Sequence, residues 1–292
     1  MELFRVSGKD HPADLTPADL VAWCSAPKGN NSIRSRVSVV SVFFRWAMRA
    51  GHITVNIAEH VTGADSPLRN YQRVYGKAQS PNPGRWLTKE QAFTELVAAC
   101  QDGSDLGLRD EVVVRLGLLG MRASEIGRLE VGNLHIDDSA PSITWTGKRY
   151  KPRRIVPGAQ LIAVLREYLA RYADAIGRPL QPTDPIVCPQ VLGTHGRPRL
   201  RWGTASTDAH QAVYKIVRTR SADAGLGHVA PHDLRRTAAG ILHRSTDGNG
   251  KHDFDLLDIQ KVLGHSDPVI TMRAYLDPMD NGVIERASTF LD

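Results

Sequence analysis

The sequence predicts a mainly α-helical protein, in which a small helical domain precedes a mixed, mostly helical domain with a small β-hairpin or sheet. Three observations support this prediction. Apolar residues recur at helical spacing through most of the chain, a single pair of strand-like segments interrupts them, and a stretch rich in proline and glycine divides the chain at residues 76–85. The length of 292 residues also fits about two domains.

The first domain is expected to span residues 1–75 and to contain only helices. Thr16 followed by Pro17 is typical of a helix start, because threonine caps the first turn and proline fits the first helical position. Residues 32–50 predict an amphipathic helix that ends at Gly51. Its apolar stripe consists of Ile33, Val37, Val40, Phe44, Ala47 and Met48.

A linker over residues 76–86 is expected to lead into the second domain, residues 87–292. Thr88 and Gln91 predict a capping box at its first helix. Further helices are expected over residues 110–119, 159–173, 207–222, 233–243 and 254–263. One strand pair, residues 142–146 and 153–156, flanks a turn at 147–152, and Trp145 is expected to pack within its strand.

Composition excludes several classes of protein. The chain is 41 % hydrophobic and 23 % charged, as in ordinary globular proteins. Its longest apolar stretches, residues 37–44 and 116–121, are too short to span a bilayer, and its N-terminus lacks the apolar core of a signal peptide. Three widely spaced cysteines predict neither a disulfide framework nor a zinc ribbon, but small buried side chains in a reducing cytoplasm.

The net charge of +6 is modest, but its distribution is uneven. Residues 66–89, 139–166 and 185–207 contain no acidic residue. Their clustered basic residues are Arg69, Arg73, Lys77, Arg85 and Lys89, then Lys148, Arg149, Lys151, Arg153 and Arg154, then Arg197, Arg199 and Arg201. Such windows favour binding to a phosphate backbone, since a nearby carboxylate would cancel the attraction. The polar face of the helix at residues 32–50, with Arg34 and Ser35, is either a solvated surface or a DNA-contacting one.

Four segments of the second domain concentrate arginine, histidine, lysine and tyrosine. They are Gly-Met-Arg-Ala-Ser-Glu-Ile at 120–126, Thr-Gly-Lys-Arg at 146–149, Pro-His-Asp-Leu-Arg-Arg-Thr at 231–237, and Leu-Gly-His at 263–265 continuing to Ala-Tyr-Leu at 274–276. Together they resemble the tyrosine recombinase (phage integrase) family, whose catalytic residues occur in the chain order Arg, Lys, His, Arg, His, Tyr. The matching residues here are Arg122, Lys148, His232, Arg235, His265 and Tyr275.

The chemistry of these residue types agrees with the resemblance. Guanidinium groups suit the charge that gathers on a phosphodiester during displacement, so Arg122 and Arg235 are expected to clamp the phosphate. His232 lies three residues before Arg235 on one predicted helix and can donate to the phosphate or accept the tyrosine proton. The resemblance implies that Lys148 is the general acid, Tyr275 the nucleophile and His265 a hydrogen-bond donor to the phosphate. Glu125 is expected to orient the arginine and histidine side chains.

The resemblance further implies a site-specific recombinase that works through a 3′-phosphotyrosyl intermediate, as a tetramer on two DNA duplexes and with a possible DNA-bending accessory protein. No cofactor is implied, and no paired acidic residues with two-metal spacing occur in the sequence. The tail at residues 281–291 is expected to pack on its own subunit or to dock on a neighbour. The residues expected to contact DNA are Arg34, Ser35, Arg69, Arg73, Lys77, Arg149, Arg199 and Arg201.

Alternatives remain within and beyond this family. Integration of a phage or mobile element is favoured over resolution of chromosome dimers or plasmids, because the spacing of the motifs is irregular. The interval from Arg235 to His265 is several residues longer than usual, and the extra residues, 245–253, are polar and are expected to form a mobile loop. The interval from His265 to Tyr275 is one residue longer than the commonest form. A type IB topoisomerase would use similar chemistry. A non-catalytic DNA-binding module would keep the basic windows but lose some of the six residues.

Overall fold

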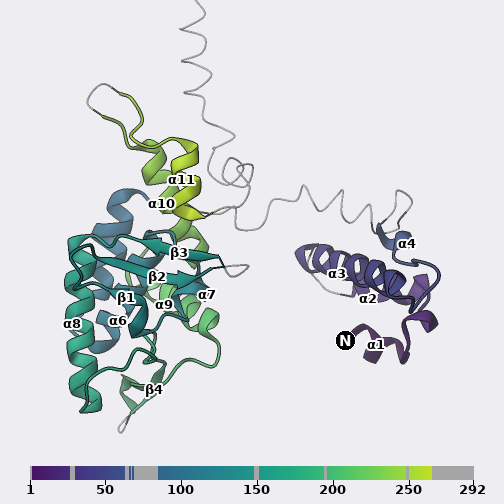
Figure 1. Ribbon diagram of the computed structural model, residues 1–292, viewed down its shortest axis with the longest axis horizontal. Helices are drawn as coiled ribbons and strands as arrows, with labels where there is room; N and C mark the ends of the chain where they lie inside the picture. The colour runs from purple at the N-terminus through teal and green to yellow at the C-terminus, as the bar shows by residue number, and fades with distance from the viewer. Residues whose placement is uncertain are drawn as a thin grey trace, which may run out of the picture. The chain divides into compact units, whose positions relative to one another are not determined.

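The structure is a computed structural model that describes residues 2–26, 30–62, 66, 68, 85–147, 151–193, 196–247 and 250–264. The chain divides into two compact units, residues 1–83 and 84–292 (Figure 1). None of the helices in the described parts of the chain is long and apolar enough to cross a membrane.

The described part of the N-terminal unit is helical. Its elements are α1 (Glu2–Ser7), the 3₁₀ turn η1 (Pro12–Asp14), α2 (Pro17–Ser25), α3 (Asn30–Arg49) and α4 (Glu59–Thr62). Thr16 caps α2 as predicted, because its hydroxyl accepts from the Asp19 amide at 3.2 Å while the Asp19 carboxylate accepts from the Thr16 amide at 2.9 Å. The core side chains of α3 are those predicted except Met48, which is 44 % exposed. Ala47 takes the last inward position, and the next residue is rotated about 100° away from it.

The C-terminal unit contains most of the helices. After η2 (a π-helical stretch, Gln91–Leu96) and η3 (Ala98–Cys100) come α6 (Asp105–Leu118), α7 (Ala123–Ile126), α8 (Ala159–Ile176), α9 (Ala209–Asp223), α10 (Pro231–Arg244) and α11 (Leu256–Leu263). The predicted capping box is present, with Thr88 and Gln91 bonding each other's amides at 3.1 Å. The helix α6 lies inside this unit (Figure 1) and packs against α8, α9 and α10. Its buried side chains belong to the hydrophobic core.

Two small antiparallel sheets accompany these helices. In the first, β2 (Ser142–Thr146) lies between β1 (Leu134–His135) and β3 (Pro152–Ile155), with Trp145 opposite Arg153. The second pairs β4 (Gln190–Leu192) with β5 (Pro198–Leu200). The β2–β3 pair and the buried packing of Trp145 were predicted. The strands β1, β4 and β5 were not, because two or three residues are too few to show a period of two.

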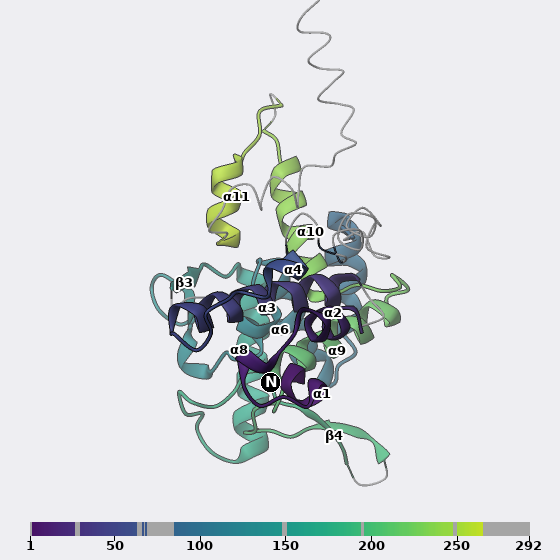
Figure 2. The ribbon, with the colours of Figure 1, turned by 90° about the vertical axis from the view of Figure 1, so that its right-hand side faces the viewer.

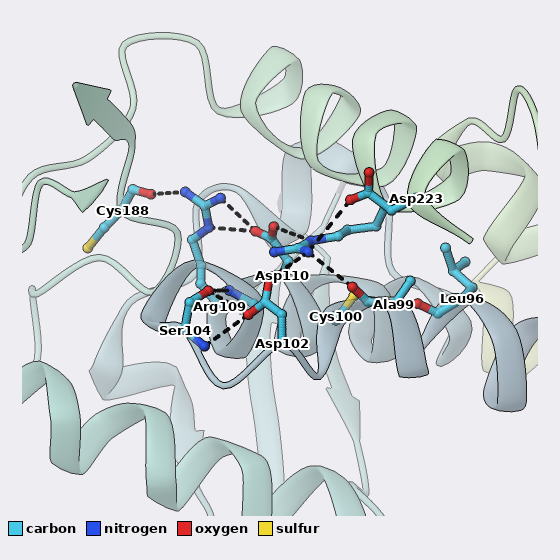
Figure 3. Close-up of polar contacts among 11 residues, drawn as sticks. Leu96, Ala99, Cys100, Asp102, Ser104, Arg109, Asp110, Cys188 and Asp223 are labelled. Atoms are coloured by element: carbon cyan, nitrogen blue, oxygen red, sulfur yellow. Dashed lines mark hydrogen bonds and ion pairs between the residues drawn. The ribbon is translucent and has the colours of Figure 1, made fainter. Parts of the chain in front are cut away.

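A buried ion-pair network fixes α6 to α9 (Figure 3). Asp110 accepts from Arg109 at 2.6 Å and from Arg220 at 2.8 Å, and Arg220 also reaches Asp102 at 2.9 Å. Two backbone carbonyls accept further bonds from this group: Nη1 of Arg109 donates to Cys188 at 2.8 Å, and Nη1 of Arg220 donates to Ala99 at 3.0 Å. Because α6 leads directly into the loop before α7, this network anchors the start of the segment that carries Arg122.

Two further expectations concern the loop after α10 and the cysteines. Residues 245–253, which were expected to form a mobile loop, connect α10 to α11; in their described part Thr246 pairs with His252 and the Asp253 amide donates to the Ser245 carbonyl at 3.0 Å. All three cysteines are free and buried, as predicted. Burial raises the pKa of Cys24 to about 11 and that of Cys100 to about 12.

Candidate active site

Arg122 lies in the turn between α6 and α7. Gly120 adopts a left-handed conformation with φ of 86°, which lets the chain turn sharply after α6. Arg122 then precedes α7, and its side chain is 34 % exposed. Nη1 of Arg122 donates to Oε1 of Glu125 at 2.9 Å, so the buried carboxylate fixes the direction of the guanidinium.

The first turns of α10 supply His232 and Arg235. Pro231 begins the helix, and the Asp233 carboxylate accepts from the Ala230 amide at 3.0 Å. His232 is exposed, whereas Arg235 is only 1 % exposed. The Arg235 guanidinium donates to the carbonyls of Gly120 and Leu263, so it joins the turn before α7 to the end of α11.

The β2–β3 hairpin approaches the same place. Gly147, the last described residue before Lys148, donates its amide to the Lys151 carbonyl at 2.8 Å. A Cβ atom placed on Gly147 would lie 3.5 Å from Oε1 of Glu125. On β3, Arg153 donates from Nη2 to the Val262 carbonyl at 2.8 Å. The hairpin, α7 and α11 therefore meet around Glu125 and Arg153.

Gly264 caps the C-terminal end of α11 and is the last described residue before His265. Its φ of 62° is left-handed, and its amide donates to the Gln260 carbonyl at 2.7 Å. The space that a Cβ would take is filled by the Arg153 guanidinium. The left-handed conformation favours glycine at this position, and a side chain there would also have to displace the Arg153 guanidinium.

The electrostatics of the site are dominated by arginine. Although the His232 side chain is exposed to solvent, the protein packed beside its ring desolvates the ring and lowers its pKa; the positive charges of Arg236, Arg235 and Arg122 lower it further, and Asp233 opposes them. The ring is therefore neutral at pH 7, and it can accept a proton there. Burial likewise lowers the pKa of Arg153, with Glu125 acting in the opposite direction.

The structure brings Arg122, Glu125, His232 and Arg235 together. Several other predicted residues lie outside the described residues, namely Lys148, Arg149, His265, Tyr275, Arg69, Arg73, Lys77 and the tail at 281–291. Arg34 lies in α3, but its side chain is also outside the description, and Ser35 is exposed on the same helix.

The remaining basic residues lie elsewhere. Arg199 and Arg201 are exposed, but Figures 1 and 2 place the β4–β5 hairpin at the end of this unit away from α10 and α11. Arg85 is half-buried and donates to the Leu226 carbonyl, so it serves packing within the unit. Arg153 was included only in a basic window, since nothing in the sequence marks its contact with a carbonyl 109 residues away.

Comparison with known proteins gives a consistent result. A family model described as the phage integrase family matches residues 85–281. The tyrosine recombinase XerC of Mycobacterium sp. (strain KMS) is 30 % identical over 267 residues, which cover 90 % of this chain and 78 % of the relative. The tyrosine recombinase XerD of Neisseria meningitidis serogroup B is 31 % identical over 183 residues, covering 62 % of this chain and 55 % of the relative.

Solved structures share the fold. XerH site-specific recombinase, bound to its palindromic difH substrate in a post-cleavage complex, aligns with a TM-score of 0.64 at 16 % identity, covering 96 % of this chain and 73 % of that one. The Tn1549 transposon integrase, in complex with transposon right end DNA, aligns with a TM-score of 0.60 at 14 % identity, covering 100 % and 92 %.

Proposed function

The chain belongs to the phage integrase family of tyrosine recombinases, and from this premise we propose how its residues divide the work of cutting and rejoining DNA. The observation that carries the proposal is the convergence of Arg122, His232 and Arg235 with the two chain segments that lead into Lys148 and His265. These residues and segments come from four separate parts of the chain, and the composition of the chain does not explain why they lie together.

We propose that Tyr275 attacks the scissile phosphorus through its phenolic oxygen. The bond from phosphorus to the 5′-oxygen breaks, Lys148 protonates that oxygen, and a 3′-phosphotyrosyl link with a free 5′-hydroxyl results. His232 is neutral at pH 7 and is suited to accept the tyrosine proton. In the reverse step a 5′-hydroxyl from a partner strand attacks the phosphotyrosine, so no external energy source is needed.

Arginine supplies the charge that the phosphate requires. Arg122 is partly exposed and already oriented by Glu125, so we propose it as the first contact to a non-bridging oxygen. Arg235 is buried and bonded to two carbonyls, so its contact with phosphate requires the side chains around it to shift when DNA binds. His265 adds a hydrogen bond to the same phosphate in this proposal.

Duplex DNA and further copies of the chain are the proposed partners. The XerH and Tn1549 neighbours are bound to DNA, and the lambda integrase neighbour is a tetramer bound to a Holliday junction. We propose a tetramer on two duplexes, with the N-terminal unit as the core-binding domain and residues 76–86 as the linker. Arg34, Ser35, Arg69, Arg73, Lys77 and Arg149 are its proposed DNA contacts. An accessory protein that bends DNA remains part of the proposal.

Two biological roles fit the same chemistry. We propose integration of a phage or mobile element, because the surplus at residues 245–253 departs from the regular spacing of the motifs. Resolution of chromosome dimers is the second candidate, since the relatives named above are XerC and XerD. The recognised site decides between them: a site within a mobile element supports integration, and a single chromosomal site supports resolution.

A nicked suicide substrate tests the chemistry. A core site is first selected from random-sequence duplexes by binding, and a nick next to the cleavage position lets the freed end diffuse away. Wild type should accumulate a covalent protein–DNA adduct, also in EDTA. Tyr275→Phe should form none while binding the same duplex equally well. An adduct with Tyr275→Phe would show that the nucleophile is misassigned, and a requirement for magnesium would contradict charge stabilisation by arginine.

A further inference from the structure

We propose that Arg153 is a positioning residue for strand transfer: it fastens the β2–β3 hairpin, whose turn includes Lys148, to the end of α11. This inference rests on the proposed function, because it assigns Arg153 an effect through the general acid Lys148. In this proposal Arg153 is not itself a catalytic residue, because it acts through the placement of Lys148.

The position of β3 explains why such a fastening is needed. Among the described residues the strand order is β1-β2-β3, so β3 lies at the edge of this sheet and pairs with β2 alone. The turn beyond it begins at Gly147 and is closed by the bond from the Gly147 amide to the Lys151 carbonyl. Within the part of the chain that the structure describes, strand pairing therefore leaves the outer edge of β3 without a backbone partner.

Arg153 makes two directional contacts that compensate for this. Its guanidinium carbon lies 5.6 Å from the centre of the Trp145 ring, across the strand pair. Nη2 donates to the Val262 carbonyl at 2.8 Å, in the last turn of α11. The aromatic contact directs the side chain, and the hydrogen bond fixes it to a second element.

The packing around this side chain is close. The guanidinium fills the space over Gly264, immediately before His265, and a Cβ on Gly147 would lie 3.0 Å from Cγ of Arg153. Glu125 is near enough for its charge to act on Arg153. One side chain thus lies beside Gly147, which leads into Lys148, and over Gly264, which leads into His265.

The neighbouring arginine shows that this arrangement is particular to Arg153. Arg154 points to the other face of β3 and is exposed, and its Nη2 donates to the Ala140 carbonyl at 3.5 Å. Lysine could not replace Arg153 fully either, because an ammonium group lacks the planar fork that stacks on a ring and donates sideways. An arginine that only contributed charge to the protein surface would require neither the contact with Trp145 nor the hydrogen bond to Val262.

The test compares two versions of the suicide substrate, one ordinary and one with sulfur in place of the bridging 5′-oxygen. Sulfur leaves as a thiolate without protonation, because a thiol is far more acidic than an alcohol, so this substrate does not need the general acid. Arg153→Ala should slow cleavage of the ordinary substrate by about 10²-fold, the cost of a misplaced catalytic group. It should cleave the sulfur substrate at close to the wild-type rate.

Three further variants complete the test. Lys148→Ala should give the same pattern, with a large loss of cleavage rate on the ordinary substrate and little loss on the sulfur substrate. Arg153→Lys keeps the charge, and should lie between wild type and Arg153→Ala with the same relief on sulfur. Arg171→Ala removes an equal charge from the exposed surface of α8, where it pairs with Glu167, and should leave both rates unchanged.

The outcomes are distinct. Equal slowing of both substrates by Arg153→Ala, or no slowing of either, would overturn the positioning role while leaving the recombinase chemistry intact. Failure of the wild type to form an adduct on either substrate would instead overturn the proposed function, and this inference with it. Should Arg153→Ala not fold, Arg153→Lys carries the same comparison.

Discussion

Arg122 and Glu125 are joined by two hydrogen bonds, one through the backbone and one through the side chain. Oε2 of Glu125 accepts from the Arg122 amide at 2.9 Å, and Oε1 accepts from Nη1 at 2.9 Å. A single buried carboxylate therefore caps α7 and aims the guanidinium. The serine and glutamate that follow Arg122 in the sequence thus have different surroundings, since Ser124 is half-buried and Glu125 is buried.

Glu125→Gln should slow cleavage by at least about tenfold, because loss of a charged hydrogen-bond partner weakens the orientation of Arg122 by roughly 1.5–3 kcal/mol. DNA affinity should change little, since the positive charge of Arg122 remains. Single-turnover cleavage and a binding titration measure the two effects. Glu167→Gln, which breaks an exposed pair with Arg171, is the matched control and should alter neither.

Gly264→Ala should damage the site more than an ordinary helix-end substitution. The left-handed conformation alone costs alanine roughly 1–2 kcal/mol. At Gly264 the new methyl group must also displace the Arg153 guanidinium. Gly177→Ala is the matched control, because Gly177 ends α8 with φ of 66° and has open space around it. Gly264→Ala should lose more unfolding free energy in urea and more cleavage rate than Gly177→Ala. Equal losses for the two variants would contradict the contact between Gly264 and Arg153.

His232 should titrate below its usual pKa of 6.5. It is then neutral at pH 7, and cleavage should decline only as the pH falls through this lowered pKa. The unfolded chain binds the proton at higher pH, so this group also reduces stability as the pH drops below 6.5. Arg236→Gln removes a nearby cation and should raise the pKa of His232, as measured by NMR. Arg244→Gln, near the other end of α10, should not.

Asp110→Asn should destabilise the C-terminal unit by about 3–5 kcal/mol, because it leaves the buried charges of Arg109 and Arg220 without their shared carboxylate. Asp105→Asn, which weakens an exposed pair with Arg171, should cost less than about 1 kcal/mol. Equilibrium unfolding in urea measures both. A similar small loss for the two variants would show that the network in Figure 3 contributes little to stability.

Much of the fold could be predicted because its signals are local. The caps at Thr16 and Thr88, the stripe of α3 and the strand β2 each depend on residues within a few positions of one another. The error at Met48 arose at the margin of a stripe, where one residue rotates the side chain out of the core.

The site could be predicted only in part, because its geometry depends on contacts between distant segments. The resemblance selected Arg122, His232 and Arg235 by type and order, but gave no indication that Arg235 is buried against two carbonyls. Arg153 and Arg85 belong to basic windows that looked alike in sequence, and both instead contact backbone carbonyls of other elements. Local charge does not distinguish a side chain that packs from one that meets DNA.

The central claim, that Tyr275 becomes covalently linked to DNA, is tested most directly by identifying the linked residue. The adduct trapped on the suicide substrate is digested with protease and nuclease, and the nucleotide-bearing peptide is sequenced by mass spectrometry. The account predicts a phosphate on Tyr275 joined to the 3′ end of the cut strand, with a free 5′-hydroxyl on the released fragment. A phosphate on any other residue, or a link to the 5′ end, would contradict it.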